Sequence, residues 1–150
     1  MDALPVGCVN VALAQIMGYT HQKYTPPLTF TLPNSTMTYM PNFIKMTQKA
    51  SINDLQGQAQ MQVQYLMLNF YNMNKTTSKK DWDGAVLESG VSEENILNTM
   101  NKFFKYNPKA PFDGDQVWAS LRNNNPVLML TTNHAFITVS YTHLTLPTIA

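Results

Sequence analysis

Apolar residues between Ile52 and Met73 recur at intervals of three and four, and this spacing constrains the fold more than any other feature of the sequence. The series consists of Ile52, Leu55, Ala59, Val63, Leu66, Phe70 and Met73. Because an α-helix turns once in about 3.6 residues, all members lie on one face of a helix. The sequence therefore predicts a long amphipathic helix over residues 52–73.

Two further helices are predicted from the residues at which they begin. Ser92 can cap a helix because its hydroxyl can accept a backbone hydrogen bond, and Glu93 and Glu94 follow in the first turn, where negative charge is favoured. Asp113 or Asp115 can cap a shorter helix in the same way. The apolar residues expected to point inward from these two helices are Ile96, Met100, Phe104, Val117, Trp118 and Leu121.

Strands are predicted only near the end of the printed sequence. Residues 127–130, Val-Leu-Met-Leu, follow an Asn-rich turn at 123–126 and have the length and apolarity of a buried strand. A second apolar run occupies 134–137, after a Thr-Thr-Asn turn. Residues 19–47 contain four prolines, and residues 74–90 are polar, so both segments are expected to be loops. The expected order is therefore helices first and strands last.

Composition excludes several classes of function. The chain has 150 residues, 10 Lys+Arg against 9 Asp+Glu and a net charge of +1, which is typical of one soluble globular domain. With 13% charged residues there is no basic patch for nucleic acid or an anionic membrane. No apolar run reaches the roughly 18 residues of a spanning helix, and Met1-Asp2 does not open a signal peptide. The single Cys excludes an internal disulfide, and no pair of Cys exists to hold a structural metal.

That single cysteine, Cys8, is either a small buried hydrophobe or a reactive thiol. It opens the apolar segment 8–17, which is predicted as a short central helix, buried all round and ending at Gly18-Tyr19. The first turn of a helix favours the thiolate, and the N–H of Cys8 could stabilise an oxyanion. His134, at the start of a strand, could accept the thiol proton. A lone Cys and a lone His are more often structural than catalytic.

The two segments that contain Cys8 and His134 resemble one known family. Residues 7–19 read GCVNVALAQIMGY, and those letters are similar to GCVATAxAQIMxY, the cysteine helix of streptopain and its relatives. These relatives are the papain-like cysteine peptidases of bacteria. Residues 89–106 resemble the family's Ser-rich loop and following helix, and 118–137 resemble its approach to the catalytic histidine, GHAFV. The resemblance extends from residue 7 to about residue 138.

The resemblance implies both a fold and an activity. The expected fold is α+β and papain-like, here incomplete, with the helical part and the first strands of the β part. The expected activity is that of a thiol endopeptidase, secreted from a bacterium as a proenzyme, which acts on protein or peptide substrates. Cys8 would be the nucleophile and His134 the general base. No cofactor or metal is implied, and the propeptide would be a partner in the parent protein.

The sequence departs from the family pattern at three places. Papain-like enzymes take a second oxyanion donor from a Gln five or six residues before the Cys, and residues 2–7 contain no Gln. Asn133 stands where the family has Gly before the His. The Asn that orients the imidazole, and the Trp-Gly stretch near it, lie downstream of the His in the family and do not follow His134 here. Asn133 cannot replace that Asn, because adjacent strand residues point to opposite faces.

The last residues of the sequence account for the absence of the orienting Asn and of the Trp-Gly stretch. Residues 139–148, VSYTHLTLPT, look like the translation of a transposase adapter used in preparing sequencing libraries. We therefore expect 1–138 to be a partial peptidase domain, 139–150 to be a non-native tail, and the fragment alone to be inactive.

Two other functions remain open from the sequence. The chain could be a non-catalytic secreted or surface binding module that keeps the papain-like scaffold without its oxyanion and orienting residues. Alternatively, the same Cys/His pair could catalyse acyl transfer, because a dyad does not itself choose water as the acceptor.

Overall fold

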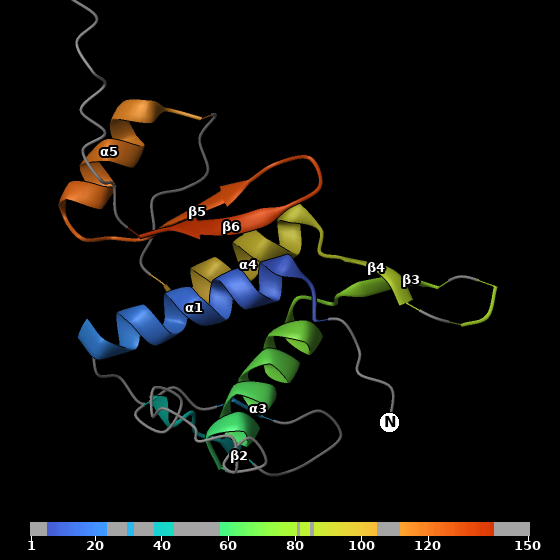
Figure 1. The fold of residues 1–150 in the computed structure, drawn as a ribbon. Helices are drawn as coiled ribbons and strands as arrows, with labels where there is room; N and C mark the ends of the chain where they lie inside the picture. Colours follow the sequence, from blue (N-terminus) through green and yellow to red (C-terminus); the bar gives the residue numbers. More distant parts are fainter. Residues whose placement is uncertain are drawn as a thin grey trace, which may run out of the picture.

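The computed structural model describes residues 6–23, 30–31, 38–43, 58–80, 82–84, 86–104 and 112–139. These residues form an α+β arrangement of helices and small antiparallel sheets (Figure 1). The helices are α1 (Cys8–Lys23), α3 (Gln58–Met73), α4 (Glu93–Phe103) and α5 (Gly114–Arg122). The strands are β1 (Phe30–Thr31), β2 (Thr38–Tyr39), β3 (Thr77–Lys80), β4 (Val86–Gly90), β5 (Val127–Leu130) and β6 (Ala135–Thr138).

Each strand pairs with its neighbour in sequence, which gives three two-stranded antiparallel sheets within the described residues. Strand β3 pairs with β4 from Thr77 opposite Gly90, and an irregularity interrupts the register near Lys80. Strand β5 pairs with β6 from Val127 opposite Thr138. The β3–β4 hairpin projects from the body of the molecule, whereas the β5–β6 hairpin lies along α1 (Figure 1).

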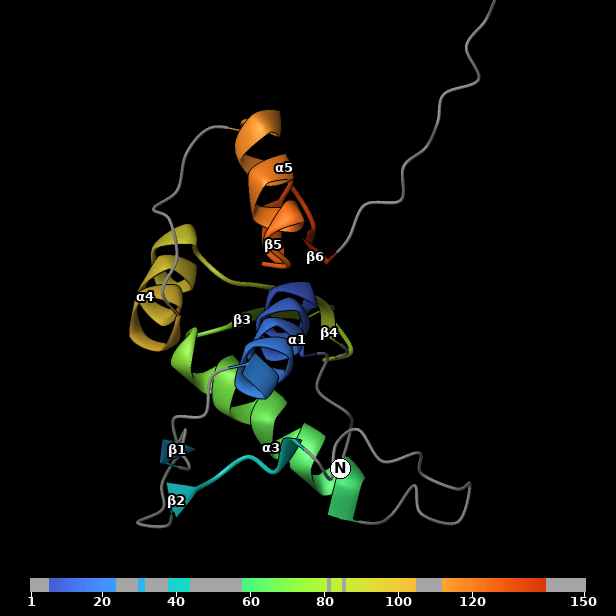
Figure 2. The same cartoon turned by 90° about the vertical axis from the view of Figure 1, so that its left-hand side faces the viewer.

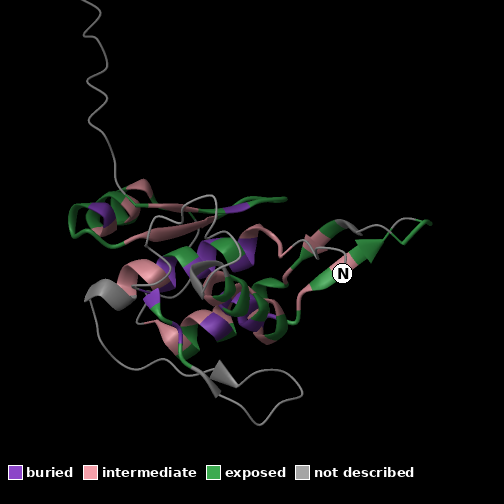
Figure 3. Cartoon of the chain, turned by 60° about the horizontal axis from the view of Figure 1, so that its bottom comes forward, coloured by how far each residue is buried: buried purple, intermediate pink, exposed green. Residues whose placement is uncertain are grey.

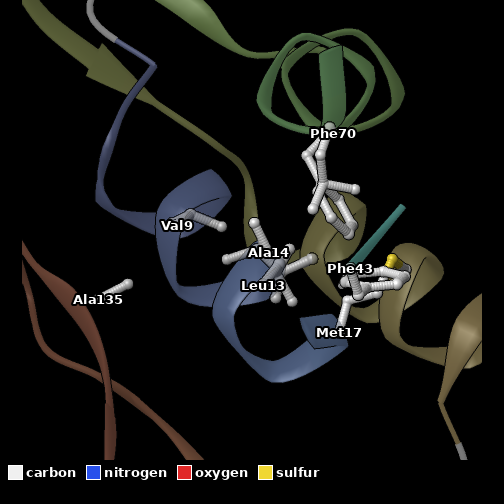
Figure 4. Packing of buried hydrophobic residues seen from close by; sticks show 9 residues of the cluster. Val9, Leu13, Ala14, Met17, Phe43, Phe70 and Ala135 are labelled. Carbon is white, nitrogen blue, oxygen red and sulfur yellow. The ribbon is translucent and has the colours of Figure 1, made fainter. Parts of the chain in front are cut away.

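Helix α1 lies at the centre, between the β5–β6 hairpin and α3, with α4 beside it (Figure 2). Leu13 and Met17 of α1 and Phe70 of α3 are completely buried. Other buried members of the core are Val9, Ala14, Phe43, Leu66, Ile96 and Ala135. Figure 4 shows that this cluster fills the space around α1 and reaches from α3 to strand β6. The core therefore fixes α1 against both the helical layer and the last hairpin.

The predicted central helix is present, but its end and its burial were predicted incorrectly. Helix α1 continues through Gly18 to Lys23. A Cβ atom at Gly18 would lie 3.7 Å from the Phe43 ring, an ordinary contact distance, and the helix continues past this glycine beside Phe43. Val11 and Gln15 are exposed, hence α1 has a solvent-facing side and is not buried all round. Tertiary packing overrides the local preference of Gly for a helix end.

The three amphipathic helices are confirmed where the structure describes them. Helix α3 buries Leu66 and Phe70 of the predicted face; residues 52–57 lie outside the described residues. The Ser92 hydroxyl accepts a hydrogen bond from the backbone N–H of Asn95 at 3.3 Å and caps α4. The Asp113 carboxylate accepts from the N–H of Asp115 at 2.9 Å and caps α5. Local capping chemistry determined these helix starts.

The predicted loop over 74–90 is wrong, because it contains the β3–β4 hairpin. Its strands are largely exposed, as the green hairpin in Figure 3 shows, and therefore lack the alternation of apolar and polar residues that identifies a strand. Trp82 near the hairpin tip is 93% exposed. Trp118, which was expected to point inward from its helix, is 42% exposed, so that expectation is wrong.

The predicted hairpin near the end of the sequence is confirmed. Strands β5 and β6 occupy 127–130 and 135–138, joined by the expected turn. Strand β5 is not fully buried as predicted: Val127, Leu128 and Met129 are half-buried and Leu130 is exposed. Within the predicted loop over 19–47, the described residues instead include the last turn of α1 and the β1–β2 pair. Of the predicted tail, Val139 is exposed, and residues 140–150 lie outside the described residues.

Candidate active site

Cys8 is the first residue of α1, and Gly7 before it has a backbone conformation that favours glycine. The φ angle of Gly7 is +85°, and a Cβ atom there would lie 2.8 Å from the Ser89 Oγ atom of strand β4. An L side chain would be strained by the positive φ and would push against Ser89. The chain therefore enters α1 through a turn that brings the start of the helix directly against β4.

The half-buried Cys8 thiol lies in the first turn of α1. The Gly7 carbonyl accepts a hydrogen bond from the N–H of Val11 at 3.3 Å, which is the first bond of the helix. The N–H groups of Cys8 and the next two residues precede this bond and have no acceptor within the helix. They give this end of α1 a partial positive charge that favours an anion such as a thiolate or an oxyanion.

Strand β6 brings a backbone donor to the thiol. The N–H of Ala135 donates a hydrogen bond to the Cys8 Sγ atom at 3.3 Å. The hairpin explains why the Ala135 N–H points away from β5. The N–H of Thr131 donates to the His134 carbonyl at 2.8 Å, and in an antiparallel pair the residue next to such a bonded position turns its own N–H away from the partner strand. In Figure 1 the start of α1 lies next to β6, on the side away from β5. The structure thus brings Cys8 and the residue after His134 together.

The His134 side chain occupies the other face of β6. Ala135 is 4% exposed and packs against α1, whereas His134 is exposed, because successive side chains of a strand point in opposite directions. The imidazole stacks on the Phe136 ring with 6.0 Å between the ring centroids and 22° between the planes. It makes no hydrogen bond to Cys8 or to any other described residue. The peptide of His134 is next to the thiol, but the ring is not bonded to it.

Asn133 is exposed in the turn before β6 and makes no hydrogen bond to His134 among the described contacts. Residues 1–5, which precede the site, lie outside the described residues. Within the described ranges no three His, Cys, Asp or Glu side chains gather as metal ligands. The described helices are also too short or too polar to cross a lipid bilayer.

The sequence did not predict a chain of hydrogen-bonded, buried polar side chains that begins at Asn10, two residues after Cys8. Asn10 and Asn74 are completely buried, and Thr99 is 4% exposed. Asn74 Nδ2 donates to Asn10 Oδ1 at 2.6 Å, and the Thr99 hydroxyl donates to Asn74 Oδ1. The only signal in the sequence is that Asn10 interrupts an otherwise apolar stretch of the helix. Its partners lie 64 and more positions away, so spacing could not reveal them.

The chain matches no model of a known protein family, no curated protein and no solved structure.

Proposed function

We propose that the chain carries the nucleophile and the general base of a cysteine endopeptidase with a papain-like fold. One observation carries the proposal: the only cysteine of the sequence lies in the first turn of a central helix and accepts a hydrogen bond from the N–H of Ala135, next to His134. The unpaired N–H groups of the helix start and the Ala135 N–H are donors of the kind that stabilise an anion in a reaction. A buried structural cysteine needs neither of them.

The proposed reaction has two stages. The Cys8 thiol transfers its proton to the His134 imidazole, and the sulfur attacks the carbonyl carbon of a peptide bond. The tetrahedral oxyanion accepts a hydrogen bond from the Cys8 N–H, and the imidazolium returns the proton to the leaving amine as the C–N bond breaks. Water then attacks the thioester carbon while His134 takes its proton. The C–S bond breaks, the carboxylic acid leaves, and the imidazolium returns the proton to the Cys8 sulfur.

For this chemistry the His134 ring must leave Phe136 and turn to the edge of β6 that faces Cys8. The ring is exposed and makes no hydrogen bond to a described residue, so no described polar contact opposes that rotation. Protein or peptide substrates, secretion from a bacterium and a propeptide partner belong to the same proposal, and they depend on the family resemblance of residues 7–138.

Alkylation of Cys8 tests the first chemical step without a substrate. The chain has one cysteine, so intact-mass spectrometry after treatment with iodoacetamide measures this thiol alone. At pH 6 a free thiol with its usual pKa of about 8.5 is almost entirely protonated and reacts slowly. We expect the folded chain to react at least roughly tenfold faster than the chain unfolded in urea, because a paired base typically contributes about 10²-fold or more.

His134→Ala should remove most of this rate advantage, and only the contribution of the helix start and of the Ala135 N–H should remain. His143→Ala is the matched control, because the resemblance assigns no role to that histidine, and it should leave the rate unchanged. A folded chain that reacts no faster than the unfolded chain would refute the nucleophile. A fast rate that His134→Ala does not lower would refute the base.

One observation favours the alternative, a non-catalytic binding module on the same scaffold. The His134 imidazole stacks on Phe136 instead of bonding to Cys8, which is the arrangement of a structural or surface histidine. If the chain is such a binding module, iodoacetamide should alkylate Cys8 no faster in the folded chain than in the unfolded chain.

A further inference from the structure

Three buried polar side chains link the start of α1 to two other parts of the fold. Asn10 is in the first turn of α1, Asn74 follows α3, and Thr99 is in α4. Asn10 Nδ2 also donates to the hydroxyl of Thr76, at the start of β3, at 2.9 Å. We call these four side chains, Asn10, Asn74, Thr76 and Thr99, the amide network. Its member Asn10 lies in the same helical turn as Cys8, the residue that the proposed function assigns as the nucleophile.

The amide network holds the backbone on both sides of Cys8. Asn10 Nδ2 donates to the Val6 carbonyl at 2.6 Å, so the residue two positions before Cys8 is tied to the residue two positions after it. Between them, Gly7 has its positive φ and lies against Ser89. Through Thr76 the same amide fixes the beginning of the β3–β4 hairpin that contains Ser89.

Every polar atom of the Asn10 side chain has a hydrogen-bond partner, either in the network or, for one N–H, in the Val6 carbonyl. Its two N–H groups meet Val6 O and Thr76 Oγ1, and its oxygen accepts from Asn74. An apolar residue could fill the same space, but it would not impose a direction, whereas hydrogen bonds are satisfied in only one arrangement of the partners. A fully satisfied polar group in an apolar core therefore indicates that the position of the helix start matters.

We propose that Asn10 is a positioning residue for Cys8: through the amide network it sets the entry into α1, so that the Cys8 sulfur meets the N–H of Ala135. The catalytic consequence rests on the proposed function, but the geometry does not. Asn10 does not touch the substrate or the reacting atoms in this proposal. It acts through the backbone of residues 6–8.

Two matched pairs of variants test the proposal. Asn10→Ala removes the centre of the network, and Asn69→Ala is its control. Asn69 is 2% exposed, but among the described residues its side chain bonds only the Tyr65 carbonyl of α3. Thr76→Val removes one bond to Asn10. Its control is Thr20→Val, because the Thr20 hydroxyl bonds carbonyls of its own helix and no other group within the described ranges.

The decisive readout is hydrogen exchange at the Ala135 amide, followed by NMR and compared with the exchange of core amides in the same variant. We expect Asn10→Ala to speed Ala135 exchange relative to the core by roughly three- to tenfold, the factor that one net hydrogen bond represents. Thr76→Val should act in the same direction with a smaller factor. Asn69→Ala and Thr20→Val should lower the melting temperature without a selective effect at Ala135.

The proposal is overturned if the Ala135 amide exchanges at the same rate, relative to the core, in a variant and in its control. If Asn10→Ala does not fold, the comparison of Thr76→Val with Thr20→Val decides alone. Iodoacetamide alkylation of Cys8 then separates this proposal from the proposed function. A selective effect at Ala135 in a chain whose Cys8 is unreactive supports the positioning and refutes the peptidase. A reactive Cys8 whose rate and Ala135 exchange are the same in Asn10→Ala and Asn69→Ala refutes the positioning alone.

Discussion

Replacement of Gly7 by Ala tests how the chain enters the helix that begins with Cys8. The φ of +85° costs an L residue about 1–2 kcal/mol, and the new methyl group would lie 2.8 Å from Ser89 Oγ. That hydroxyl ends a short side chain and can rotate away, since Ser89 Cβ and O are at 3.6 Å and 3.8 Å, which are ordinary contacts. We therefore expect Gly7→Ala to destabilise the fold by about 1.5–3 kcal/mol, which is the backbone cost plus about 0.5–1 kcal/mol for moving the Ser89 hydroxyl, or by about 3–12 °C in melting temperature.

Gly84→Ala is the matched control for the backbone part of this cost. Gly84 has a nearly identical φ of +84°, but no atom lies within 4 Å of its would-be Cβ. Differential scanning calorimetry of Gly7→Ala, Gly84→Ala and Gly7→Ala combined with Ser89→Ala separates strain from contact. We expect the Ser89→Ala change to recover part of the Gly7→Ala loss, with a coupling of about 0.5–1 kcal/mol. Equal losses in both glycine variants, without recovery, would refute the close approach of Gly7 to β4.

Two further predictions concern the scaffold. Leu13→Ala removes a completely buried side chain from the core around α1 and should lower the free energy of unfolding in urea by about 3 kcal/mol. Val11→Ala, at a 37% exposed position, should lower it by less than about 1 kcal/mol. Similar losses in the two variants would show that Leu13 does not belong to the core. Ser92→Ala removes the cap of α4 and should lower the free energy of unfolding in urea by about 1 kcal/mol, while Ser92→Asp should retain most of the stability. An unchanged urea midpoint in Ser92→Ala would show that the cap does not stabilise α4.

The helices after residue 57 were predictable because their signals are local. Ser92 and Asp113 mark two helix starts by the chemistry of a single side chain, and both caps form. The apolar face of α3 is a periodic pattern within one segment. The β3–β4 hairpin was not predictable, because strands that are largely exposed on both faces carry no alternating pattern. The end of α1 was missed for another reason: Phe43 packs over Gly18, and this contact is not local.

The candidate site was predictable in its residues but not in its geometry. The resemblance to the streptopain-like family singles out Cys8 and His134, and the structure brings their segments together across 127 positions at the Ala135–Cys8 hydrogen bond. Two features of the contact were out of reach. The donor to the sulfur is a backbone N–H, which every residue except proline has, so the residue type at position 135 does not predict it. The face on which the His134 ring lies follows from the register of β6 with β5.

The surroundings of Cys8 combine three constraints from different parts of the chain. Gly7 must approach β4, Asn10 must reach the turn after α3, and the free edge of β6 must present the Ala135 N–H to the sulfur. A thiol that only filled the core would need apolar contacts, and any residue of similar size would serve. Here the constraints fix the direction of the backbone at Cys8, and the proposed role as a nucleophile would require this, because a displacement of about 1 Å can cost 10²-fold in rate.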